Sequence, residues 1–121
     1  MDIVSAAFFD HFTNPRNVGL LEDPDGLGRY GDPGCGDFLV VSLRVEKGII
    51  EDIGFMCRGC SAAIATSSVT TELARGRSVE EALQITGDMI EEELGGLPED
   101  KRHCSLLGER ALKAALASLE T

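Results

Sequence analysis

Three of the four cysteines stand in short contexts where a thiol could bind a metal. Cys35 is flanked by glycines and followed two positions later by Asp37. Cys60 follows a glycine, and Cys104 follows His103. Thiolate, imidazole and carboxylate groups all bind zinc and iron in proteins. Because the three cysteines are far apart in sequence, only folding could bring them together, and the pattern predicts a metal or metal-cluster centre.

The donor count leaves the fourth ligand open. A tetrahedral site needs four donors, so three thiolates leave one position for Asp37 or His103. Cys60 and Cys104 fall at the first residues of predicted helices, where free N–H groups and the helix dipole favour a thiolate. We therefore expect a lowered pKa for both thiols. Cys57 shares the phase of apolar strand residues, and we interpret it as a small buried hydrophobic residue. Its C-x-x-C spacing with Cys60 has neither the second pair of a zinc ribbon nor a thioredoxin-like context.

The elements that position these residues are predicted to be a small sheet followed by helices. Residues 38–45 and 49–57 alternate as strands, and Glu46-Lys47-Gly48 between them suits a tight hairpin. Residues 20–36 are rich in glycine and proline, so we expect a loop with one short strand near 28–31. Helical patterns cover 3–12, 61–75, a segment opened by a Ser78–Glu81 capping box, 87–94, and a last helix from about 103 with Leu112, Leu116 and Leu119 buried. The sum is an α+β fold, a small three-stranded antiparallel sheet packed against a layer of helices.

Bulk properties set further limits. With 121 residues and 43% hydrophobic content, the chain is expected to form a single domain over residues 1–121. A net charge of -10 argues against binding to nucleic acid or to anionic membranes and favours partners with basic patches. No apolar run approaches the roughly 20 residues needed to span a bilayer, and no signal peptide is evident. We therefore expect a cytoplasmic protein without a membrane segment. In that compartment the cysteines should stay reduced.

Ordered motifs along nearly the whole chain resemble the IscU/NifU-type iron-sulfur cluster assembly scaffold proteins. The matching residues are Asp10–Phe12 with Asn14–Gly19, Pro33–Asp37, Gly48–Asp52, Gly59–Cys60 with Ala63–Ser68, and Leu97–Pro98 with Lys101 and His103–Ser105. The resemblance implies a carrier, not an enzyme. On such a scaffold a [2Fe-2S] cluster is built from iron and from persulfide sulfur delivered by a cysteine desulfurase, and is then passed to apo-proteins.

The resemblance also implies residue roles. Cys35, Cys60 and Cys104 become cluster ligands, with Asp37 or His103 as the fourth donor. Cys104 becomes the persulfide acceptor, and Asp37 is linked to how readily the cluster leaves. Zinc could occupy the cluster-free site. Lys101 belongs to the matching motif and is included among the site residues. Two copies of the chain could share one cluster as a homodimer, a point on which the sequence is silent.

Departures from the family pattern qualify these roles. Between Leu97 and Lys101 two acids replace the Pro-Val that Hsp70-type chaperones grip in bacterial members, which argues against chaperone-assisted release. His103 and the lack of an insertion between Cys60 and Cys104 favour the scaffold branch over the zinc-dependent SufU branch. Cys57 replaces a residue that is usually not cysteine, so it offers an additional ligand or a persulfide relay.

Two other functions compete with the scaffold. In the first, Cys35, Asp37, Cys60 and Cys104 hold zinc, and one thiolate leaves the metal to accept sulfur from a desulfurase. In the second, Cys104 and His103 form a catalytic thiol and base. Adjacent residues at a helix start point about 100° apart, which argues against this pair.

Overall fold

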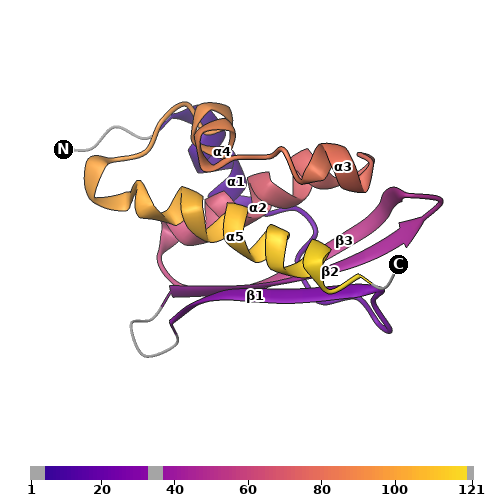
Figure 1. The fold of residues 1–121 in the computed structure, drawn as a ribbon. Helices are drawn as coiled ribbons and strands as arrows, with labels where there is room; N and C mark the ends of the chain where they lie inside the picture. The colour runs from indigo at the N-terminus through magenta and orange to yellow at the C-terminus, as the bar shows by residue number, and fades with distance from the viewer. Residues whose placement is uncertain (1–4, 33–36, 120–121) are drawn as a thin grey trace.

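The computed structural model describes residues 5–32 and 37–119. Within these residues a three-stranded antiparallel sheet of order β1-β2-β3 carries helices on one face (Figure 1). The elements are β1 (Gly26–Asp32), β2 (Asp37–Glu46), β3 (Ile49–Arg58), α1 (Ala6–Thr13), α2 (Ser61–Ala74), α3 (Val79–Ala82), α4 (Gly87–Glu93), the short 3-10 helix η1 (Glu99–Lys101) and α5 (His103–Ala117). The predicted α+β fold is confirmed.

The core lies between the sheet and the helix layer. Helix α5 packs on β1 and β2, α2 packs on β3 and on α5, and α1 and α4 cover α2 from outside. The inward side of β2 is fully buried at Leu39, Val41 and Leu43, with the alternation of a sheet that is covered on one face. The layers therefore place the start of α5 close to the start of β2. Among the described helices, none has the length and apolar character needed to cross a bilayer.

Two local sequence signals, a hairpin turn and a helix cap, are confirmed by the structure. Lys47 and Gly48 have φ values of 53° and 77°, as a two-residue hairpin turn with two left-handed positions requires. Ser78 and Glu81 form the predicted capping box at the start of α3. Helix α1 begins at Ala6, and the part of the predicted first helix at residues 3–4 lies outside the described residues.

His11 on α1 is buried, and its Nδ1 lies 2.7 Å from the hydroxyl of Ser68 on α2. The ring is therefore part of the packing between these two helices. It is not a surface residue.

Strand β1 is longer than predicted. Its glycines suggested a loop, but they allow α5 to pack closely against the strand. A Cβ atom at Gly28 would overlap the backbone of Ala115 on α5. Nearer the start of α5, a Cβ atom at Gly108 would overlap the side chain of Thr70 on α2. Helix α5 thus lies against β1 and α2 at distances that only glycine allows. The seven-residue strand was hidden in a segment whose composition is typical of loops.

We expect Gly28→Ala to lower the free energy of unfolding by about 1–3 kcal/mol, because the new methyl group must push α5 off the strand. Urea unfolding followed by circular dichroism measures the change. Leu27→Ala is the matched control, since Leu27 is half exposed on the other face of β1 and should lose less than about 1 kcal/mol. A Gly28→Ala protein as stable as wild type would contradict the close contact.

Candidate metal centre

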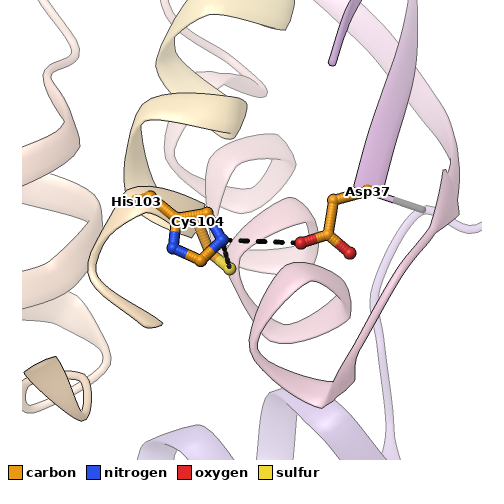
Figure 2. A group of neighbouring side chains, drawn as sticks. All are labelled: Asp37, His103 and Cys104. Atoms are coloured by element: carbon orange, nitrogen blue, oxygen red, sulfur yellow. Dashed lines mark hydrogen bonds and ion pairs between the residues drawn. The ribbon is translucent and has the colours of Figure 1, made fainter. Parts of the chain in front are cut away.

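Three potential metal ligands converge from two elements that are distant in sequence. Asp37 is the first residue of β2, and His103 and Cys104 are the first two residues of α5. One ligand atom from each of the three residues can be chosen so that all lie within 4.8 Å of one another. His103 Nε2 lies 3.5 Å from Asp37 Oδ2 and 3.7 Å from Cys104 Sγ (Figure 2). The docking of α5 on the sheet therefore creates the convergence that the sequence predicted for these residues.

The donors differ in their access to solvent. Cys104 is fully buried, the Asp37 side chain is 31% exposed and the His103 side chain is 62% exposed. A pocket of about 340 Å³ borders Asp37 and His103 and is also lined by Tyr30, Gly31, Leu106 and Leu107. The sulfur thus lies on the inner side of the group, and the oxygen and nitrogen donors face open space.

Gly59 leaves room for the Asp37 carboxylate. A Cβ atom at Gly59 would stand 2.5 Å from Asp37 Oδ1, closer than real contacts allow. The sheet register explains this, because Leu39 pairs with Cys57 and two further positions bring Asp37 opposite Gly59. The sequence analysis assigns no role to Gly59 beyond its position next to Cys60. The register of the predicted hairpin could have assigned it this role.

Cys60 joins the group from a third element. It is the N-cap residue of α2 and is half buried. Burial is the main cause that raises the pKa of the Cys104 thiol to about 12. The neighbouring Cys60 thiol is the second cause, and Asp37 adds to the effect. The nearby charge of Lys101, at the end of η1, acts in the opposite direction. The lowered pKa that we expected for Cys104 is therefore wrong for the metal-free protein. Removal from water and negative neighbours outweigh the helix terminus.

The orientation of His103 also differs from the expectation. Although His103 and Cys104 are adjacent on the helix, the imidazole folds back until Nε2 lies within hydrogen-bond distance of the sulfur. The argument that their side chains must diverge is wrong, because the long His103 side chain reaches back over the first turn. The contact still does not produce an activated nucleophile, since Cys104 is buried and its pKa is raised.

The other two cysteines, Cys35 and Cys57, are not part of this group of donors in the described residues. Cys35 lies outside the described residues, so its role as a ligand stays a prediction. Cys57 packs against the core as expected for a small apolar residue, but it is only half buried. The described residues thus bring together Asp37, His103 and Cys104, with Cys60 next to Cys104 and Lys101 close by.

Comparisons with known proteins identify the family of this chain. The NifU-like N terminal domain model matches residues 4–121. An iron-sulfur cluster assembly scaffold protein IscU of Archaeoglobus fulgidus is 56% identical over 108 residues, covering 89% of this chain and 71% of the relative. The scaffold protein IscU of Escherichia coli K12 is 46% identical over 121 residues, covering 97% and 94%.

Solved structures share the fold. A crystal structure of an iron-sulfur cluster assembly scaffold protein for the SUF system, from Fervidobacterium islandicum AW-1, superimposes with a TM-score of 0.71 at 23% identity, covering 93% of this chain and 95% of that chain. At this identity the likeness concerns the fold alone. The family model and the close relatives carry the assignment: the chain belongs to the NifU-like N-terminal domain family, the IscU/NifU-type scaffold proteins.

The raised pKa of Cys104 predicts slow alkylation in the metal-free protein. A pKa of about 12 instead of 9.0 leaves little thiolate at about pH 8. We expect iodoacetamide to modify native Cys104 at least about a hundredfold more slowly than the urea-unfolded chain. Because the thiol remains protonated, its rate should still rise about tenfold per pH unit up to about pH 10. Mass spectrometry of the tryptic peptide His103–Arg110 measures both. A rate that is already constant below about pH 8 would indicate a stabilised thiolate instead.

Proposed function

We propose that this protein is a scaffold on which a [2Fe-2S] cluster is assembled from iron and persulfide sulfur and then transferred to apo-proteins. The convergence of Asp37, His103 and Cys104, with Cys60 beside them, carries the proposal. Cys35, Cys60 and Cys104 are the proposed thiolate ligands, because thiolates are the standard anchors of iron-sulfur clusters. Asp37 or His103 supplies the fourth donor. The names of the close relatives support the same role.

The difference in exposure across the site suits a cluster that has to leave. Cys104 would hold its iron from the buried side, while the fourth donor is an exposed imidazole or a partly exposed carboxylate. An oxygen or nitrogen ligand that water can reach exchanges more readily than a buried thiolate. An acceptor protein could therefore replace this ligand first, starting transfer at the open pocket beside Asp37 and His103.

Sulfur delivery places a demand on the same site. Cys104 is the proposed persulfide acceptor, yet its side chain is fully buried and its thiol is protonated in the metal-free protein. Reaction with an external persulfide therefore requires the first turn of α5 to move. The hinge would be the segment before it, where Gly95 and Gly96 adopt φ values of 75° and 101°. Movement would expose the sulfur and lower its pKa together.

The proposed partners follow from charge and chemistry. A net charge of -10 suits a cysteine desulfurase that presents a basic surface, and the acceptors are apo-proteins with free thiolates. Chaperone-assisted release is not part of the proposal. Glu99 and Asp100, which replace the middle of the chaperone motif, are both exposed within η1. A homodimer that shares one cluster would place two sets of these donors around it.

Zinc-bound sulfur transfer is the second candidate, because a carboxylate, an imidazole and a thiol within 4.8 Å also suit zinc. Elemental analysis and a visible spectrum of protein purified without oxygen distinguish the two. Under the scaffold function, incubation with iron, cysteine and a desulfurase yields the absorption bands of a [2Fe-2S] cluster. Protein that keeps one zinc per chain and accepts sulfur without forming these bands would favour the zinc function.

Replacing the carboxylate tests how the cluster is held. We expect Asp37→Ala to retain the cluster and to lengthen its lifetime severalfold, since an exchangeable oxygen donor next to the thiolates is removed. The decay of visible absorbance in the presence of a chelator measures the lifetime. Asp100→Ala is the matched control, because it makes the same charge change at an exposed position outside the group.

The outcome also identifies the fourth ligand. Loss of all cluster binding in Asp37→Ala would make Asp37 a required ligand and His103 a bystander. A lifetime equal to that of wild type and of Asp100→Ala would exclude any role of Asp37 in cluster release.

A further inference from the structure

Cys57 lies near the proposed site, and the scaffold function does not use its thiol. It lies near the end of β3 opposite Leu39, on the sheet face that the helices cover. Its side chain is half buried and packs against the core. Only two residues separate it from Cys60, and the chain bends at Gly59 between them. This bend turns the chain from the strand into α2.

Cys60 is close to both of the other described cysteines. Its thiol lies beside that of Cys104 and contributes to the raised pKa of Cys104. Burial raises the pKa of Cys57, and Asp37 and Cys60 are both close enough to add to that effect. The Ser67 hydroxyl on α2 lies close to the Cys57 thiol and acts in the opposite direction on its pKa. Among the described cysteines, Cys60 therefore has both Cys104 and Cys57 as neighbours.

We propose that Cys57 is a resolving thiol that reduces persulfide sulfur to sulfide inside the site. This inference rests on the proposed function, because it needs persulfide sulfur to reach Cys60. Cluster assembly needs sulfur as sulfide, whereas a persulfide delivers it two electrons more oxidised. Cys57 and Cys60, with only two residues between them, could supply those two electrons where the cluster is built.

The steps balance without an outside reductant in the first turnover. The Cys60 sulfur attacks the outer sulfur of the Cys104 persulfide, and the Cys104 thiolate leaves. Cys57 then attacks the inner sulfur of the resulting Cys60 persulfide. A Cys57–Cys60 disulfide forms, the bond to the outer sulfur breaks, and that sulfur leaves as hydrosulfide with both electrons of the bond. The two thiols are oxidised by two electrons, and the outer sulfur is reduced by two.

The disulfide would also make sulfide release precede iron binding at Cys60. While Cys60 is oxidised it cannot bind iron, so a cellular dithiol must reduce the pair before Cys60 serves as a cluster ligand. Each cycle then releases one sulfide and consumes one dithiol. A half-buried position limits the access of bulk thiols to Cys57.

A single-turnover experiment tests this role. The reduced, metal-free protein, freed of small thiols, is mixed with glutathione persulfide without oxygen, and released sulfide is measured together with disulfide-linked peptides. Trypsin places each cysteine in its own peptide, since cleavage follows Arg29, Arg44, Lys47, Arg58, Arg75 and Arg102. We expect about one sulfide per chain and a link between the peptides Gly48–Arg58 and Gly59–Arg75.

Two substitutions at Cys57 separate chemistry from packing. We expect Cys57→Ser and Cys57→Ala, each checked for folding by circular dichroism, to release at least about tenfold less sulfide and to retain the persulfide. Cys60→Ser should lose the link as well. Wild-type sulfide release in both Cys57 variants, or a link that joins Cys60 to the peptide of Cys35 or Cys104, would overturn the proposal.

A parallel reaction isolates the scaffold function. When iron and inorganic sulfide are supplied directly, the Cys57 variants should form the same visible bands as wild type, because no persulfide has to be reduced. Failure of wild type in this reaction would overturn the scaffold function and the inference that rests on it. Failure of the persulfide reaction alone would overturn only the role of Cys57.

Discussion

The site depends on how closely helix α5 lies against its two neighbours. Gly28 admits its backbone to β1, and Gly108 admits it to α2. The first turn of the same helix carries His103 and Cys104 toward Asp37 and Cys60. The donors come from three elements, and His103 and Cys104 meet Asp37 and Cys60 only when α5 is docked. A small displacement of α5 would therefore open the site without unfolding the sheet, which links access to Cys104 with helix packing.

The electrostatic character of the group follows from this packing. Cys104 is taken out of water beside Cys60 and Asp37, and the one positive charge shown to act on it, that of Lys101, does not outweigh them. In the metal-free protein the sulfur is consequently a neutral thiol. A metal ion is the strongest counter-charge such a site can receive, and its binding would drive the proton off Cys104. Proton release and metal binding would thus be coupled by the same burial that makes the free thiol unreactive.

The sequence predicted what depends on local signals and missed what depends on packing between elements. The Lys47-Gly48 turn and the Ser78 capping box need only a few neighbouring residues, and both were correct. Strand β1 was underestimated because its glycines look like a loop until α5 is placed against Gly28. The fold-back of His103 and the raised pKa of Cys104 likewise require knowledge of burial, and a helix-start position alone pointed the other way.

Cys60 takes part in two kinds of proposed chemistry. Toward solvent, His103 and Asp37 offer ligands that can be exchanged, which suits the departure of a cluster. Toward the core, Cys57 and Cys104 are shielded thiols, which suits sulfur chemistry that water and free thiols would otherwise short-circuit. Cys60 is the N-cap residue of α2, but its side chain makes no capping hydrogen bond, so its sulfur is available either as a metal ligand or for a disulfide, though not for both at once. That exclusivity would keep sulfur reduction and cluster building in sequence within one small site.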